Sequence, residues 1–201
     1  MTSKHITILC VICLLALAGT SPSRAQSKKP KSENFSALAY LPTGAGPRMV
    51  GAGATRNVQI YIKTYSSDAD TARYADTLLD AGPDALLKEL QKAKSIGKVS
   101  LQGRVGFFDL KLIRSRPTEG GRLITAVTDR PIQFLEAYYS GRSEDYKFGI
   151  LQLELKDEEG HHEKGEGALV YAAKIKVLDK NKVQVENYGA EPLKLMGVRK
   201  F

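Results

Sequence analysis

The chain has 201 residues, a formal net charge of +8, and 42% hydrophobic and 26% charged residues. With a mean hydropathy of −0.26, this composition is typical of a soluble globular protein. It excludes a collagen, a disordered tail and a multi-span membrane protein. The length suffices for one or two domains, and only one is expected because no internal repeat is found.

The first 25 residues are expected to be a cleavable export signal. Lys4 precedes a mainly apolar run from Ile6 to Leu17, and Ser23-Arg24-Ala25 is close to the small-x-small sequence that signal peptidase recognises. This run is shorter than the about 20 apolar residues that cross a bilayer, so no membrane span is expected after cleavage. We therefore predict an exported protein, periplasmic or secreted, that begins at Gln26.

Both cysteines of the chain, Cys10 and Cys13, lie inside the predicted signal. The processed chain would therefore contain no thiol. This excludes disulfides, a thiolate metal site and a cysteine nucleophile from the working protein.

Residues 26–56 are predicted to form a flexible polar leader that becomes rich in Gly, Ala and Pro, which favours irregular structure. A single folded domain is predicted to span residues 57–201. It starts with a strand, because Val58, Ile60 and Ile62 alternate with polar neighbours.

The periodicity then becomes helical. Ala72, Leu78 and Leu79 recur at helical spacing after a predicted N-cap at Ser67 or Asp68. Gly82 is expected to end this helix and Pro83 to begin a second one, whose apolar stripe includes Leu86, Leu87 and Leu90. The sequence therefore predicts a helical pair.

Strand patterns dominate the rest of the chain. They include Phe108–Leu112, Leu123–Thr128, and a long hairpin in which Leu151–Leu155 precedes Leu169–Val177. Short turns between strands require antiparallel pairing. The predicted fold class is α+β: a mainly antiparallel meander sheet of about six to eight strands, forming a partly closed barrel or a sandwich, with one inserted helical pair.

Four charged residues after the predicted strand Leu123–Thr128 are the candidate ligand-binding site: Asp129, Arg130, Glu136 and Arg142. Arg130 is the central candidate, because a guanidinium held by a carboxylate suits an anionic ligand. Asp129 is expected to pair with Arg130 or Arg142. Structural ion pairs are the alternative interpretation of the group.

Metal and cofactor sites are not predicted. His161 and His162 are the only weak metal candidates, since adjacent histidines on extended backbone point apart and lack the spacing of a zinc helix. The glycine segment from Gly44 to Thr55 precedes a strand and lacks the order of a phosphate loop. No catalytic residue is assigned.

A basic stretch with interleaved aromatic residues includes Arg104, Lys111, Arg114, Arg116 and Arg122. Such a face could contact nucleic acid. Nucleic acid is not expected as a partner, because the chain is predicted to be exported and mixes 22 acidic residues among its bases.

Four segments resemble a group of uncharacterised exported bacterial proteins without an assigned activity: Thr128–Ile132, Phe148–Leu153, Gly165–Gly167 and Val185–Tyr188. The similarity extends from about Val58 onward. It implies a bacterial envelope or secreted setting, and no catalytic residue, cofactor or substrate.

Three functional hypotheses remain open. The first is a non-catalytic β-rich domain that binds an unknown ligand or protein of the cell envelope. The second is a hydrolase with two carboxylates, roughly 5 to 9.5 Å apart, drawn from Asp129, Glu136, Asp145, Glu166 and Glu186. The third is an interaction module that adds a partner strand to an exposed sheet edge.

Overall fold

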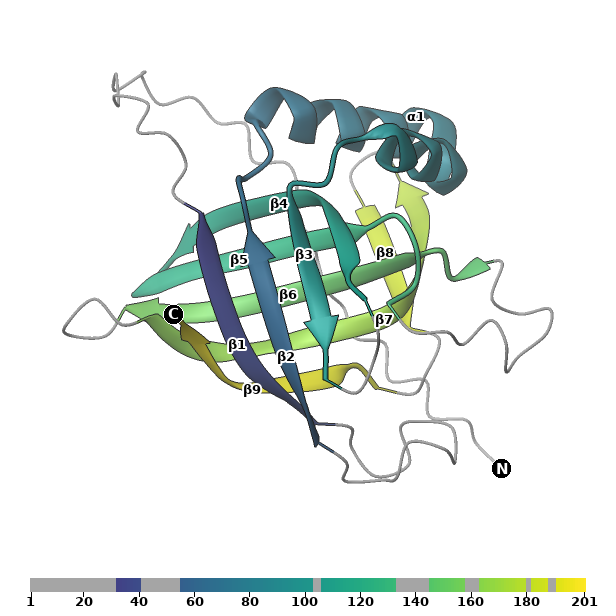
Figure 1. The fold of residues 1–201 in the computed structure, drawn as a ribbon. Coiled ribbons are helices and arrows are strands. Elements are labelled where there is room, and N and C mark those ends of the chain that lie inside the picture. The colour runs from purple at the N-terminus through teal and green to yellow at the C-terminus, as the bar shows by residue number, and fades with distance from the viewer. Residues whose placement is uncertain are drawn as a thin grey trace, which may run out of the picture.

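The computed structural model describes residues 32–40, 55–102, 106–132, 145–157, 163–179, 182–187 and 191–201. These contain one helix and nine strands (Figure 1). In chain order the elements are β1 (Glu33–Tyr40), β2 (Thr55–Ile62), α1 (Asp68–Lys92), β3 (Gly97–Leu101), β4 (Phe108–Thr118), β5 (Gly121–Thr128), β6 (Phe148–Asp157), β7 (Glu163–Asp179), β8 (Lys182–Asn187) and β9 (Leu193–Lys200).

The strands form a closed antiparallel barrel. Strands β1 to β7 pair in sequence order, and β9 then pairs with both β7 and β1, which completes a ring of eight strands. β8 lies outside this ring and pairs with β7. The predicted antiparallel α+β class is confirmed, and of the two predicted architectures the barrel is the one observed.

Alternate residues of the barrel strands point inward and form one apolar core. The predicted alternations are confirmed in β2, where Val58 and Ile60 are fully buried, and in β6, where Leu151 and Leu153 are buried. Phe35 of β1 joins the same cluster. Burial of apolar surface inside the ring is the main stabilising contribution to such a fold.

β1 lies within the segment that the sequence predicted as a flexible leader. Its inward residues are Phe35, Ala37 and Ala39, so two of the three are small and give a weak hydrophobic alternation. Pairing with β2 and β9 therefore makes this segment a strand, although its own sequence has little preference for one. The folded domain thus includes residues from Glu33, upstream of the predicted boundary at residue 57.

α1 begins at the predicted N-cap, where the Ser67 hydroxyl accepts a hydrogen bond from the Asp70 amide at 3.0 Å. The predicted helical pair is not confirmed, because one helix spans the whole segment. Its backbone is kinked at Gly82, whose φ of 81° lies in the region that favours glycine, directly before Pro83.

α1 covers one side of the barrel only. Leu78, Leu86 and Leu90 pack in a second apolar cluster with outward residues of the neighbouring strands, among them Phe148 and Ile175. Lys147 also donates to Asp84 of the helix. The outer faces of β1, β2 and β3 lie away from the helix (Figure 1). Within the described chain, α1 is not long and apolar enough to span a membrane.

Substitution of an inward residue of β1 tests whether this strand belongs to the domain. Phe35→Ala should lower the free energy of unfolding by about 3 to 5 kcal/mol, because it leaves a cavity in the core. Ser36→Ala, on the outward side of the same strand, should change it by less than about 0.5 kcal/mol. Urea denaturation measures both; equal effects of the two substitutions would contradict the assignment of β1 to the barrel.

Candidate functional site

The predicted ligand site is only partly described. Asp129 and Arg130 follow β5, whereas Glu136 and Arg142 lie outside the described residues. The expected pairing of Asp129 with an arginine is wrong for Arg130: the Asp129 carboxylate lies 3.5 Å from the Nζ of Lys111 on β4. Antiparallel pairing of β4 with β5 brings these two residues together from distant positions in the sequence.

Arg130, the central candidate of the predicted site, contacts Phe107 and Phe108. Its Nη2 donates to the backbone carbonyl of Phe107 at 3.1 Å, and its guanidinium lies 5.3 Å from the ring centre of Phe108. Arg130 therefore holds the segment that presents Phe107.

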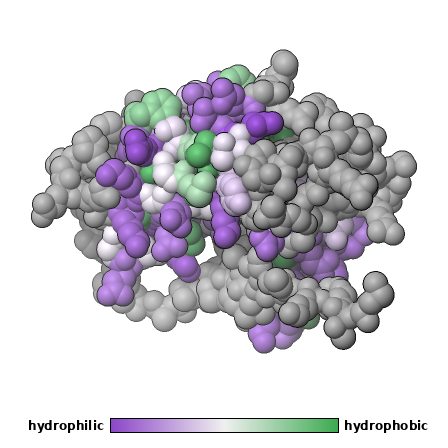
Figure 2. Space-filling view, turned by 90° about the horizontal axis from the view of Figure 1, so that it is seen from below, coloured by the Kyte–Doolittle hydropathy of each residue, from purple (hydrophilic) through white to green (hydrophobic). Residues whose placement is uncertain are grey.

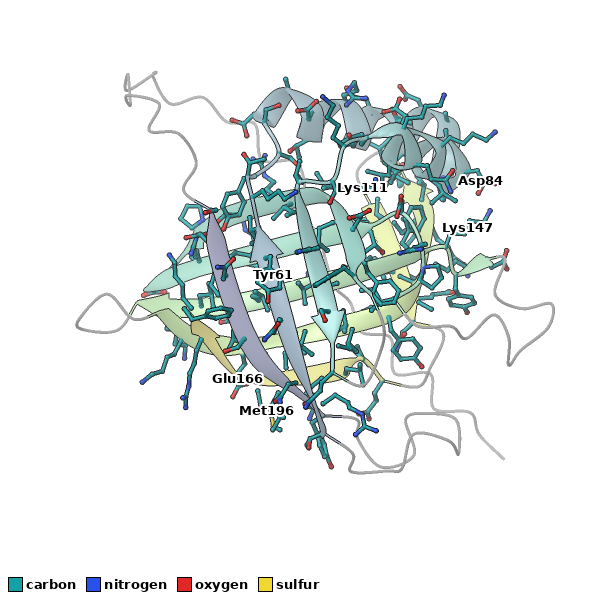
Figure 3. The ribbon with its side chains drawn as sticks, in the orientation of Figure 1. Tyr61, Asp84, Lys111, Lys147, Glu166 and Met196 are labelled. Atoms are coloured by element: carbon teal, nitrogen blue, oxygen red, sulfur yellow. The ribbon has the colours of Figure 1, made fainter. Side chains whose placement is uncertain are left out.

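Of the four described carboxylates of the hydrolase hypothesis, three are paired with lysines: Asp129, Asp145 and Glu186. Asp145 accepts from Lys174 at 2.6 Å, and Glu186 accepts from Lys176 at 2.6 Å. The hydrogen bond from Lys174 lowers the pKa of Asp145 below its ordinary 3.8, the opposite of what a general acid needs. Glu166 projects from β7, low in the view of Figure 3.

The described residues contain no cluster of three or more His, Cys, Asp or Glu side chains that could hold a metal ion. The weak metal candidates His161 and His162 lie outside the described residues.

A buried carboxylate, Glu33, lies at the end of the barrel where β1 begins. Arg122 of β5 donates to both of its carboxylate oxygens at 3.0 Å, and Lys200 of β9 donates at 2.6 Å. Tyr65, which follows β2, donates its hydroxyl to the same carboxylate. We call these four residues the Glu33 cluster.

The Glu33 cluster is held ionised by its own partners. Burial opposes the charge of Glu33, but the hydrogen bonds from Arg122, Lys200 and Tyr65 outweigh it and lower the pKa from 4.5 to about 2. Burial and the bond to Glu33 raise the pKa of Tyr65 above its ordinary 10.0. A carboxylate that remains charged and a phenol that remains neutral give no group poised for proton transfer near pH 7. The cluster therefore joins strand ends and is not an acid–base site.

A second feature, an aromatic surface, lies on the side of the barrel that α1 leaves uncovered. The Tyr61 ring lies 6.4 Å, centre to centre, from Phe107 and also from Phe201, edge to face in both cases. The Nζ of Lys98 lies 4.0 Å from the Phe107 ring centre. Phe107 is 47% exposed and Phe201 is 63% exposed. Figure 3 shows Tyr61 in the middle of this face.

Uncharged polar side chains lie beside the aromatic surface on β1 and β2. Cations flank it, because Arg199 and Lys194 of the neighbouring β9 are exposed and pair with Ser36 and Tyr40 of β1. The Tyr61 hydroxyl donates to Gln59 at 2.6 Å, and the Asn57 amide donates to Gln102 at 2.7 Å. The outward positions of β1, β2 and β3 are Asn34, Ser36, Leu38, Tyr40, Thr55, Asn57, Gln59, Tyr61, Lys98 and Ser100. Within these described strands Lys98 is the one charged residue of that set.

Exposed apolar side chains continue beside this surface. Leu38 of β1 and Met196 of β9 are paired directly across the two strands, and each is more than one third exposed. Figure 2 views the molecule from below, the side on which Figure 3 labels Met196, and shows a few hydrophobic side chains among hydrophilic ones.

Sequence reasoning did not find the Glu33 cluster or the aromatic surface. The alternation around Tyr61 does place it on the outward side of its strand, and this pattern could have identified it as an aromatic residue of the surface. Phe107, Phe201 and the partners of Glu33 come from other parts of the chain, so no local spacing connects them.

Glu33→Gln tests the strength of the Glu33 cluster. The folded pKa is lowered, so the ionised group stabilises the fold fully above pH 4.5 and progressively less as the pH falls toward 2. The wild type should exceed the variant by about 3 kcal/mol in unfolding free energy at pH 7, and the difference should shrink toward zero near pH 2. Urea denaturation across this pH range measures it.

Asp84→Asn is the matched control, because Asp84 also accepts from a lysine but its side chain is 71% exposed. This substitution should cost less than about 1 kcal/mol. A pH-independent difference between wild type and Glu33→Gln would contradict the assigned charge state.

Neither a family model, nor a curated protein, nor a solved structure matches this chain.

Proposed function

We propose that the protein is an exported, non-catalytic domain that binds a polysaccharide on the aromatic surface. The observation that carries this proposal is the row of Phe107, Tyr61 and Phe201 beside the amide and hydroxyl side chains of β1 and β2.

The interior of the barrel is occupied by its own side chains, which favours a ligand site on the outside. Phe35, Ile60, Leu110 and Ile124 are fully buried within one continuous apolar cluster. A ligand would have to displace this core, whose side chains contribute most of the stability.

The chemistry of the aromatic surface fits a sugar chain. Sugar rings present apolar C–H faces that pack on exposed aromatic rings, and Tyr adds a polar end to such a platform. Amides such as Gln59 and Gln102 supply both donors and acceptors for hydroxyl groups. A nucleic acid or an acidic protein would call for a dense basic surface, whereas Lys98 is the one cation at the outward positions of the described β1, β2 and β3.

Two contacts pre-organise the rings, which lowers the entropic cost of binding. Arg130 fixes the backbone of Phe107, and the amide of Phe201 donates to the Asn34 carbonyl at 3.0 Å. The candidate residue Arg130 thus acts in this proposal as a positioning residue.

Binding to insoluble polysaccharides tests the proposal. The purified protein is incubated with chitin, cellulose and bacterial peptidoglycan, and the bound fraction is measured against protein concentration. The wild type should be retained by at least one of them. Tyr61→Ala and Phe107→Ala should each weaken retention by about tenfold, because each removes a stacking ring worth about 1.4 kcal/mol.

Leu178→Ala is the matched control, since Leu178 is an apolar side chain, 61% exposed, on β7 rather than on the aromatic surface. It should bind as the wild type does. The proposal fails if the wild type binds none of the three polymers, or if Leu178→Ala and Phe107→Ala weaken retention equally.

Export is tested separately. The predicted signal should be removed in a bacterial host, and N-terminal sequencing of the exported protein should begin at Gln26. Replacing Leu14 and Leu15 by Arg interrupts the apolar run and should keep the chain in the cytoplasm with an intact N-terminus. Export of this variant at the wild-type level would contradict the signal assignment.

A further inference from the structure

β8 is the edge of the described sheet. One side of it pairs with β7, and the order of strands ends there. The backbone N–H and C=O groups on the other side therefore have no described strand as a partner. Such an edge is a template on which a further strand can pair.

We propose that β8 pairs with β8 of a second copy of this chain, antiparallel, about a two-fold axis at Gln184. The strand reads Lys182-Val183-Gln184-Val185-Glu186 before it ends at Asn187. In this register Lys182 of each copy lies opposite Glu186 of the other, and Val183 lies opposite Val185. The edge is therefore complementary to itself, as a two-fold interface requires.

The charge complementarity favours a second copy over an arbitrary strand. Lys182 is exposed at the start of β8. Glu186 accepts from Lys176 at 2.6 Å, and the remaining lone pairs of a carboxylate can accept a second ammonium. Opposite charges placed directly across an antiparallel pair stabilise it, and like charges destabilise it.

The apolar face of the β7–β8 pair also favours a second copy of the chain as the partner. Val183 and Val185 are only partly buried, at the margin of the apolar cluster that α1 forms with β5 to β7. Pairing with a second copy places a valine of the partner beside each of them. The apolar clusters of the two barrels then become continuous across the axis, which adds burial to the backbone hydrogen bonds.

A charged edge strand can also serve to prevent association. In this register Lys182 faces position 186 of the other copy, where a second lysine would repel it. That position is occupied by Glu186, so the charges on the two edges attract each other and do not prevent association. This interface is independent of the polysaccharide proposal, because it lies on β8 and not on the aromatic surface.

Charge reversal tests the pairing. Analytical ultracentrifugation of the purified protein should show a dimer for the wild type. Lys182→Glu places two carboxylates opposite each other at each end of the interface, and Glu186→Lys places two lysines there. Each variant alone should weaken dimerisation by at least about tenfold. An equimolar mixture should restore a dimer, because every Glu then faces a Lys.

Lys194→Glu is the control, since it reverses an exposed charge on β9, away from the edge, and it should leave the dimer intact. Thermal unfolding of each variant checks that the barrel is retained. The proposal is overturned by a wild type that is monomeric at about 100 µM, by a Lys182→Glu variant that dimerises normally, or by a mixture that stays monomeric.

Discussion

The pairing of β1 with β9 closes the sheet, and the rest of the structure depends on it. Phe35 lies opposite Lys200 in this ladder, so the first and last strands of the barrel meet along most of their length. Without that contact the other strands would leave an apolar face in water. The same contact brings Lys200 to Glu33, so that backbone pairing and the buried ion cluster reinforce each other at one end of the ring.

The outer surface of the barrel is apolar on one side and mainly polar and aromatic on another. α1 covers the apolar side. Outward residues such as Val127, Phe148 and Ile175 are apolar and buried beneath or beside the helix. The outward residues of β1, β2 and β3 are amides, hydroxyls, aromatic rings and one leucine, with a single lysine. No described element covers this side, so its exposed aromatic rings are not needed for packing against one, and the proposed binding role is therefore assigned to it.

Strong local patterns were sufficient to predict a large part of the fold. The alternation of β2 and β6, the N-cap of α1 and an interruption of regular helix at Gly82 could all be predicted, because each is encoded by neighbouring residues. β1 could not, since Ala37 and Ala39 carry little hydrophobic signal and the strand depends on partners at both ends of the chain.

The sites were harder to predict than the fold for the same physical reason. Glu33 and Arg122 are separated by 89 positions, and only the barrel brings them together. Asp129 was expected to pair with a nearby arginine, but the pairing of β4 with β5 places Lys111 beside its carboxylate. Arg130 was predicted to bind a ligand, and its hydrogen bond to the Phe107 carbonyl, which no local pattern indicated, connects it to the aromatic surface. The sequence shows that these residues are charged, but it does not show which strand will lie opposite them.

The order of strands around the ring has a consequence for synthesis and transport. Because β9 completes the circle with β1, a growing chain cannot reach the native state until its final strand has been made. Contacts between such distant segments form slowly, so the nascent polypeptide stays extended for longer than one built from local contacts. For the export proposed above this topology would be an advantage, because a secretory channel accepts only extended chains.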